Sequence, residues 1–272
     1  MTTGADVTRL AEALAAARRN GVPLDPLPWQ VAVPDAGAAY AVQHAVAESL
    51  GWFGGVSPRF WKSGGPSQSQ PLTHAPLPPV GVRVSPADCR DMRFHAPLIE
   101  IEVALKIARE MPAGTATRLA AAARDSDPAA RARLGDQIAD EWVEALCVSI
   151  EIVDSRWTDP GQASAPQKLA DLQSHGALIL GDWIPWSRRD WSAQRCEVRI
   201  GAQPPVSRTG THPLGSPTWL LPVWLDHVTR NGQSVPRGAI VTTGAWAGML
   251  PAQSGDTVLA SFDGIGSATA RL

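Results

Sequence analysis

Glutamates alternate with branched aliphatic residues in one stretch of this chain. Residues 98–108 read LIEIEVALKIA, which is typical of a half-buried strand. The alternation places Glu100 and Glu102 on the same face, with Cα atoms roughly 6.6 Å apart. Two carboxylates this close repel each other, and each is pushed toward its neutral form unless a cation lies between them. On its own, the pattern is also typical of a solvated strand face with alternating charge.

The Ile-Glu-Ile unit recurs around Glu151, in a second predicted strand over residues 146–153. If the two strands lie side by side, three carboxylates converge, which matches an oxygen-ligand site for Mg²⁺ or Mn²⁺. Asp154 is a rival ligand. In a regular strand it points to the opposite face, where Arg156 can pair with it, so the alternation favours Glu151 unless a bulge intervenes.

A lysine and a polar patch add further candidates. Lys62 follows two aromatic residues and precedes Ser63 and Gly64. The aromatic neighbours are expected to lower its pKa by desolvation, and the glycines let backbone N–H groups approach an anion. The alternative is an ordinary surface lysine at the start of a loop. Asp171, Ser174 and His175 lie in LADLQSHGALILG, just before an apolar strand, which suits either the rim of a site or a structural role.

The elements that position these residues predict an α+β fold, because long helices come first and many short strands follow. Residues 52–80 are rich in Gly, Pro, Ser and Gln and indicate a loop or lid. Residues 112–126 indicate a surface excursion. Helices are predicted over 5–19, from Asp35 to Leu50, over 127–145 and over 218–229, and strands over 98–108, 146–153, 178–180, 197–200, 238–243 and 257–261, with a last strand ending at Leu272.

Composition excludes several classes of protein. The 272 residues are 44% hydrophobic, which is enough for a sizeable core, and the net charge of −2 lacks the basic footprint of a nucleic-acid-binding protein. No apolar run is long enough for a transmembrane helix, and the N-terminus lacks the layout of a signal peptide. The three cysteines are widely spaced and form no CxxC pair, which favours the cytoplasm. Neither a G-x-S-x-G elbow, a P-loop nor a dinucleotide fingerprint is present.

Several motifs, in order, resemble the fumarylacetoacetate hydrolase superfamily, in particular its branch of 2-keto-4-pentenoate hydratases and 2-oxo acid decarboxylases. The resemblance runs almost end to end. The motifs that carry it are AYAVQ at 39–43, WKSG at 61–64, IEIEVA at 99–104, EIVDSR at 151–156, LAD at 169–171 with Ser174 and Gly176, WL at 224–225, TG at 243–244 and SGD at 254–256. Leu172 departs from the branch, which usually carries Asn there.

The resemblance implies a mixed, strongly curved β-sheet roll with flanking helices. It implies a single domain over 1–272, with a helical N-terminal portion and the lysine loop in 1–80 and a β-rich metal-binding core in 81–272. It also implies a homo-oligomer and a 2-oxo acid substrate, without nucleic-acid or membrane partners. The site residues it implies are Glu100, Glu102 and Glu151 for the metal, Lys62, Asp171 and Ser174 for catalysis, and Ser63, Gly64, Leu172 and His175 for substrate binding.

Three functions fit these residues. The first is a metal-dependent hydratase that adds water to a 2-hydroxy-2,4-dienoate during the breakdown of aromatic compounds. The second is a 2-oxo acid decarboxylase of the 4-oxalocrotonate type, or a C–C hydrolase, on the same scaffold. The third is a metal-stabilised protein without catalysis. The first two share the metal site, because both reactions need a sink for the negative charge that grows on the C2 oxygen.

Overall fold

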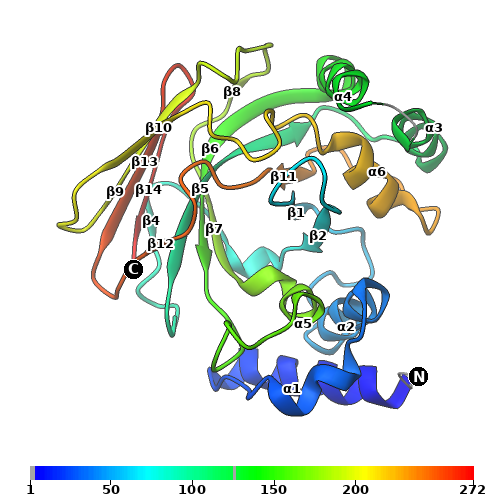
Figure 1. Ribbon diagram of the computed structural model, residues 1–272, viewed down its shortest axis with the longest axis vertical. Helices are drawn as coiled ribbons and strands as arrows, with labels where there is room; N and C mark the ends of the chain where they lie inside the picture. The colour runs from blue at the N-terminus through cyan, green and yellow to red at the C-terminus, as the bar shows by residue number, and fades with distance from the viewer. Residues whose placement is uncertain (1–3, 125–126) are drawn as a thin grey trace.

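A computed structural model describes residues 4–124 and 127–272 of the chain. Within this part, two curved sheets pack together, helices lie beside the larger one, and the long strands β5 and β6 bend through the centre of the molecule (Figure 1). The α+β class and the curved sheet predicted from the sequence are confirmed.

The larger sheet is mixed, and it carries the predicted glutamate strands at its centre. Its order is β2-β1-β11-β5-β6-β7-β3, and β12 and β8 pair with β5 and β6 respectively. β1 runs parallel to β11 and β3 parallel to β7, whereas the other pairs are antiparallel. Its strands are β1 (Phe60–Gly64), β2 (Thr73–Pro76), β3 (Val82–Val84), β5 (Leu98–Ile107), β6 (Val143–Val153), β7 (His175–Leu180), β8 (Ile184–Pro185), β11 (Ile240–Thr242) and β12 (Leu250–Pro251).

The smaller sheet has the order β10-β9-β13-β14-β4 and forms the opposite side of the main core (Figure 1). Ile99 and Ile101 of β5 share that core with Val258 and Ala260 of the smaller sheet. The intervening glutamates therefore face away from it, as the period of two requires. The strands are β4 (Ala87–Asp88), β9 (Arg195–Ile200), β10 (Val206–Thr209), β13 (Thr257–Phe262) and β14 (Gly266–Arg271).

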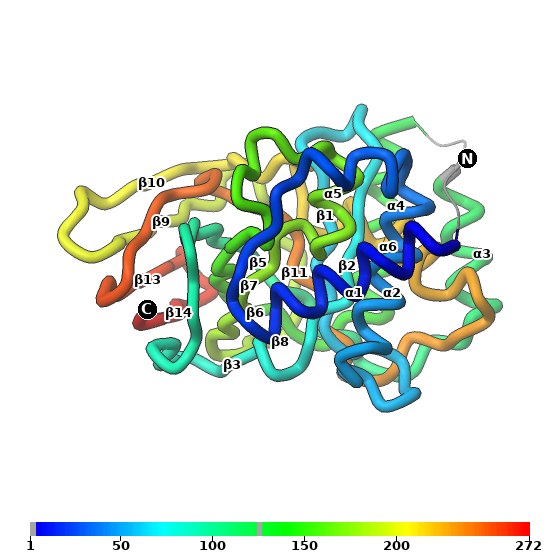
Figure 2. Tube along the Cα trace, turned by 90° about the horizontal axis from the view of Figure 1, so that it is seen from below, coloured from blue at the N-terminus to red at the C-terminus, as the bar shows by residue number. Residues whose placement is uncertain are grey.

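The helices gather at two places beside the larger sheet. α1, α2 and α5 lie together at the bottom of Figure 1, and α3, α4 and α6 lie at its upper right; seen from below, α1 crosses in front of α2 (Figure 2). The α-helices are α1 (Gly4–Asn20), α2 (Ala36–Ser49), α3 (Ala113–Arg124), α4 (Pro128–Trp142), α5 (Ala165–Ala170) and α6 (Leu221–Thr229). Short 3-10 turns are η1 (Leu27–Ala32), η2 (Pro79–Gly81) and η3 (Leu172–Ser174).

Local signals fixed where several helices begin. The Asp35 carboxylate accepts a hydrogen bond from the Ala38 N–H, and the Asp127 carboxylate accepts one from the Ala130 N–H, so both aspartates cap the helices predicted to begin there. Pro128 occupies the first helical position, where its missing N–H has no intrahelical partner to lose.

Two predictions are wrong. Residues 52–80 are not a continuous loop, because they contain β1, β2 and the turn η2. Within 112–126, residues 113–124 form α3, which packs an alanine-rich face with Ala116 and Ala120 buried; residues 125–126 lie outside the described part. Tertiary partners that are distant in the sequence stabilise both segments, and a local pattern does not show them.

Candidate active site

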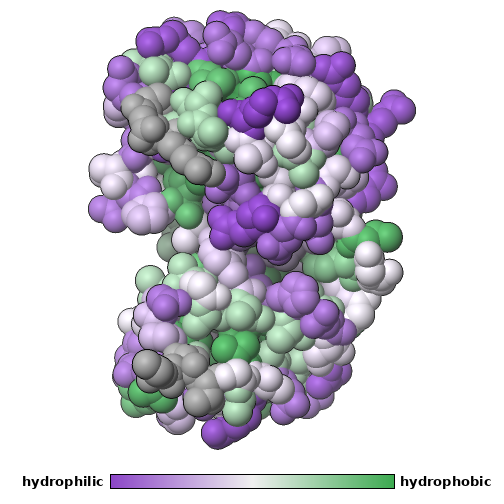
Figure 3. Space-filling view, turned by 90° about the vertical axis from the view of Figure 1, so that its right-hand side faces the viewer, coloured by the Kyte–Doolittle hydropathy of each residue, from purple (hydrophilic) through white to green (hydrophobic). Residues whose placement is uncertain are grey.

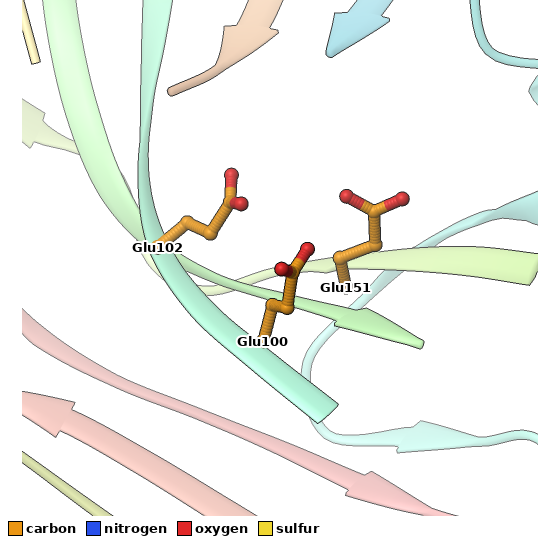
Figure 4. Close-up of side chains that lie close together, drawn as sticks. All are labelled: Glu100, Glu102 and Glu151. Carbon is orange, nitrogen blue, oxygen red and sulfur yellow. The ribbon is translucent and has the colours of Figure 1, made fainter. Parts of the chain in front are cut away.

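β5 and β6 bring the three glutamates together. Glu100 and Glu151 are direct cross-strand partners, and Glu102 lies opposite Ser149. One carboxylate oxygen from each glutamate lies within 4.8 Å of the others. Figure 4 shows the three carboxylates turned toward one another above the two strands. The alternation of each strand and the register between them together produce this cluster.

Asp154, the rival ligand, is used elsewhere. One of its carboxylate oxygens accepts the backbone N–H groups of His95 and Ala96, both at 2.9 Å. The other oxygen lies 4.0 Å from a guanidinium nitrogen of Arg156. Asp154 thus holds the chain that enters β5, and it is not part of the glutamate cluster.

The cluster carries more negative charge than its neighbourhood neutralises. Burial, followed by repulsion from Glu100 and Glu151, raises the pKa of Glu102 to about 8. Burial also raises the pKa of Glu100 to about 6. Burial would raise the pKa of Glu151 as well, but the charge of Lys62 and the hydrogen bond from His175 lower it on balance.

The donor set fits a hard divalent cation. All three donors are carboxylates, the ligands that Mg²⁺, Mn²⁺ and Ca²⁺ prefer. Within the described residues, the Oε2 atom of Glu151 is buried without a hydrogen-bond partner. An uncompensated buried carboxylate oxygen is costly, and a cation at this point removes that cost.

Lys62 lies on β1 and not at the start of a loop. Its Nζ donates to Glu151 Oε1 at 2.7 Å and lies 3.4 Å from the Gln173 carbonyl oxygen. Burial lowers the pKa of Lys62, but the three glutamates outweigh that effect and raise it above the ordinary value. The expectation of a lowered pKa is therefore wrong, because the acidic cluster dominates over the aromatic flank.

His175 and Thr242 hold the cluster from two sides. His175 is fully buried, and its Nδ1 lies 3.0 Å from Glu151 Oε1, so the imidazole holds the same oxygen as Lys62. The Ser63 hydroxyl lies 2.8 Å from His74 Nδ1. Thr242 of β11 donates to Glu102 and also lies 3.0 Å from the Ser149 hydroxyl. The contacts of His175 and Thr242 fix the Glu151 and Glu102 side chains before any ligand binds.

A cavity of about 340 Å³ opens above the glutamates. Lys62, Ser63 and Gly64 line it, whereas Asp171, Leu172, Ser174 and His175 are not among its lining residues. Gln173, Pro213 and Met249, which the sequence did not single out, also line the cavity, but Gly244 lies within the TG motif at 243–244. The complete lining is Lys62, Ser63, Gly64, Gly65, Pro66, Glu100, Glu102, Val153, Gln173, Pro213, Thr242, Gly244, Ala245 and Met249.

A strained turn brings Gln173 to this cavity. Leu172, Gln173 and Ser174 have φ angles of 55°, 53° and 60°, the left-handed region that non-glycine residues seldom occupy. The turn buries the Leu172 side chain and places Gln173 in the cavity wall, where its amide nitrogen donates to the Thr73 hydroxyl. Such strain is concentrated at functional sites, because the surrounding structure must enforce it.

Asp171 joins two arginines behind the cavity. Arg18 donates to its Oδ1 at 2.8 Å, and Arg156 donates through Nε at 3.0 Å and through its backbone N–H to Oδ2 at 2.9 Å. Burial and the neighbouring Arg156 lower the pKa of Arg18 to about 10, although Asp171 opposes this. Asp171, the predicted catalytic residue, thus belongs to an ion-pair network that connects α1 with the segment after β6.

Replacing Asp171 with Asn is expected to destabilise the protein by about 3–5 kcal/mol, because two buried guanidinium groups lose their counter-charge. Urea unfolding of the metal-free protein measures this. Asp91→Asn removes an exposed partner of Arg83 and is the matched control, with little expected change in the free energy of unfolding. Unchanged stability of Asp171→Asn together with lost turnover would instead support a catalytic Asp171.

His212 gives the fold a dependence on pH. Its Nε2–H donates to the Thr243 carbonyl at 2.9 Å, and its Nδ1 accepts the Leu214 N–H at 3.2 Å, so the neutral tautomer is fixed. Burial lowers the pKa of His212 from 6.5 to about 4. The unfolded chain therefore binds the proton first, and the stability contributed by His212 is lost as the pH falls from 6.5 toward 4.

We expect His212→Asn, which keeps an acceptor near Leu214 but does not titrate, to flatten this dependence. Between pH 6.5 and 4.5 the free energy of unfolding of the wild type should fall by about 1–2 kcal/mol more than that of the variant. Urea titrations at four pH values measure the difference. Parallel pH profiles would show that His212 is not held neutral.

The curved sheet, with three convergent carboxylates beside a buried lysine, defines an enzyme scaffold built around a candidate divalent-cation site. The chain belongs to the fumarylacetoacetate hydrolase family, because the family model described as fumarylacetoacetate (FAA) hydrolase C-terminal matches residues 119–272. The chain is therefore an enzyme of this family. Glu100, Glu102 and Lys62 precede the matched range, and Glu151 lies within it.

Two curated relatives come from Dechloromonas aromatica strain RCB. The chain is 36% identical to 2-keto-4-pentenoate hydratase 1 over 124 residues, which is 45% of this chain and 46% of that protein. It is 27% identical to 2-keto-4-pentenoate hydratase 2 over 96% of this chain and 95% of that protein. The first match thus spans about half of its relative, and the second spans nearly all of it. The predicted resemblance to this branch is confirmed.

Among solved structures, the fold is similar to 4-oxalocrotonate decarboxylase from Pseudomonas putida G7, in complex with magnesium and adipate. The TM-score is 0.76 at 19% identity, and the match covers 100% of this chain and 98% of that one. At this identity the likeness concerns the fold. No helix in the described ranges is long and apolar enough to cross a membrane.

Proposed function

We propose that this protein is a divalent-metal-dependent hydratase that adds water to a 2-hydroxy-2,4-dienoate and gives a 4-hydroxy-2-oxo acid. The observation that carries the proposal is the convergence of Glu100, Glu102 and Glu151 beside Lys62, with Glu100, Glu102 and Lys62 in the wall of one cavity. The two relatives named 2-keto-4-pentenoate hydratase support this choice of substrate class.

Glu100, Glu102 and Glu151 would hold the ion, with Mg²⁺ or Mn²⁺ the preferred candidates for an all-carboxylate site. A bound divalent ion supplies Lewis-acid stabilisation of the negative charge that grows on the C2 oxygen of a 2-oxo acid. Within the protein, Thr242 and His175 keep Glu102 and Glu151 in place, so little reorganisation accompanies ligand binding.

The Lys62 ammonium would neutralise the substrate carboxylate and move a proton. Ketonisation takes the proton from the C2 hydroxyl and places one on C5, which leaves C4 electrophilic. Water oxygen then bonds to C4, and a proton is added at C3. Lys62 lies in the cavity wall with its Nζ held by Glu151, so it can act on the substrate without a large movement.

The remaining cavity wall would select the carbon chain of the substrate. Gln173 offers an amide, while Val153, Pro213 and Met249 offer apolar surface. Ser63 and Gly64 remain candidates for substrate contact. We assign no contact with the substrate to Leu172 and His175, because one is packed in the fold and the other holds Glu151.

The second candidate is 2-oxo acid decarboxylation of the 4-oxalocrotonate type. The carboxylates and Lys62 serve it equally, because the electrons of the breaking C–C bond flow to the same C2 oxygen as CO₂ leaves. The two reactions therefore differ in the far end of the substrate and in their products, and an experiment on products separates them.

The test supplies the purified protein and Mg²⁺ with 2-hydroxypenta-2,4-dienoate or with 4-oxalocrotonate. The hydratase proposal expects a product one water heavier than the dienoate, detected by mass spectrometry, at a rate above buffer-catalysed ketonisation. Chelator-treated protein and Glu102→Gln are the controls. Release of CO₂ from 4-oxalocrotonate without hydration of the dienoate would establish the second candidate and overturn the first.

A further inference from the structure

A second cavity, of about 700 Å³, lies between α2 and the C-terminal end of α6. The molecule narrows between its two lobes on this side, as the side view shows (Figure 3). The segment after α2 forms part of the rim. Its lining includes Tyr40, Glu48, Phe53, Trp61, His227 and Arg230.

Strand β1 separates this cavity from the glutamate cavity. Trp61 lines the second cavity, whereas the next residues, Lys62 and Ser63, line the first. The two cavities are therefore distinct spaces, and no residue lines both of them. The proposed hydration uses none of the residues in the second.

The floor of the second cavity is aromatic. The His227 ring lies between Tyr40 and Trp61, with centroid distances of 4.5 Å and 5.9 Å. On its other side it approaches His74 at 4.6 Å. Phe53 adds a further ring to the lining. Flat rings of this kind favour a planar, unsaturated ligand over a saturated one.

One basic side chain of the cavity can attract an anion. Arg230 is in the lining, its side chain is about half exposed, and its guanidinium forms a loose ion pair with Asp226 at 3.9 Å. The lining also includes the Glu48 carboxylate, which is largely exposed and lies 3.3 Å from His44 Nδ1. Within the described residues, the Nδ1 atom of His227 is buried without a hydrogen-bond partner.

The pKa values of the two histidines show where the positive charge of this region lies. Burial, followed by the positive charge of Arg230, lowers the pKa of His227 to about 4. Burial and neighbouring His227 and Arg230 lower the pKa of His74 well below its ordinary value. Both imidazoles are neutral at pH 7, so Arg230 supplies the positive charge in this part of the cavity.

We infer that the cavity between α2 and α6 is a binding site for a planar aromatic carboxylate. Its ring packs against Tyr40, Phe53 and Trp61, and its carboxylate meets the Arg230 guanidinium. This site is separate from the glutamate cavity and is independent of which reaction takes place there.

The test uses benzoate as the probe, titrated by calorimetry into the metal-free full-length protein. We expect one molecule to bind with a Kd near or below about 1 mM, which is ordinary efficiency for a ligand of this size. Benzamide lacks the charge and is expected to bind at least about tenfold more weakly. Cyclohexanecarboxylate lacks the flat ring and is expected to bind several-fold more weakly.

Three variants locate the probe. Arg230→Gln is expected to weaken benzoate binding at least about tenfold. Arg208→Gln, on the exposed strand β10, is the matched control and should bind normally. Lys62→Met should also bind normally, because Lys62 belongs to the other cavity. Thermal unfolding without benzoate checks that each variant is folded.

Two results would overturn the inference. One is the absence of saturable benzoate binding by the wild type. The other is binding that survives Arg230→Gln but disappears in Lys62→Met, which would place the probe at the glutamates. Neither result depends on turnover, so failure of the proposed hydratase activity leaves this test intact.

Discussion

Glu102→Gln is expected to lower turnover at least about a thousandfold and to remove the stabilisation that Mg²⁺ gives the wild type. The amide replaces one of three carboxylate donors, so the site loses both a ligand and a negative charge. Calorimetric Mg²⁺ titration and the rate of dienoate hydration measure the two losses separately.

The metal-free variant should nevertheless fold normally. Glu102 has a pKa raised to about 8, so at pH 7 it is largely neutral without metal, and Gln is a close mimic of that form. The amide oxygen can still accept the hydrogen bond from Thr242. Glu110→Gln removes an exposed carboxylate and serves as the control. Full turnover of Glu102→Gln at an unchanged Mg²⁺ requirement would reject Glu102 as a ligand.

Lys62→Met is expected to reduce kcat/KM by about 10²–10⁴ without loss of metal binding. The ammonium contributes charge for the substrate carboxylate and a mobile proton, and Met supplies neither. Because a positive charge next to Glu151 opposes a cation, its removal should leave Mg²⁺ affinity equal or higher. This opposite effect on metal affinity distinguishes Lys62 from Glu102.

The same substitution should destabilise the metal-free protein, because the Glu151 carboxylate loses its cationic partner in a buried place. Added Mg²⁺ should restore most of the loss in Tm. Lys106→Met breaks the pair with Glu144, in which both side chains are one third exposed, and is the control, with little expected change in either quantity. Lost Mg²⁺ binding in Lys62→Met would show that Lys62 organises the metal site, and it would contradict a role limited to the substrate.

The sequence determined the features that depend on local periodicity. Alternation in β5 and β6 set which side chains share a face, so the separation of Glu100, Glu102 and Glu151 from the isoleucine core followed from the residues alone. A period of two allows no other outcome in a regular strand. Helix starts at Asp35 and Asp127 also followed, because a cap involves neighbours in the chain.

The tertiary structure decided what depends on partners that are far apart in the chain. Lys62 belongs to a strand that faces Glu151, and not to a loop, because β1 pairs with β11. The acidic cluster raises the pKa of Lys62, whereas the sequence predicted a lowered one. Arg18, which is distant in the sequence, donates a hydrogen bond to the Asp171 carboxylate.

The left-handed turn that brings Gln173 to the cavity has no local sequence signal, since non-glycine residues rarely adopt that conformation unless packing enforces it. The cavity between α2 and α6 likewise exists only because two distant helices flank β1. The sequence therefore determined which side chains share a face, while packing determined which faces meet, because pairing and burial are set by the whole fold and not by neighbouring residues.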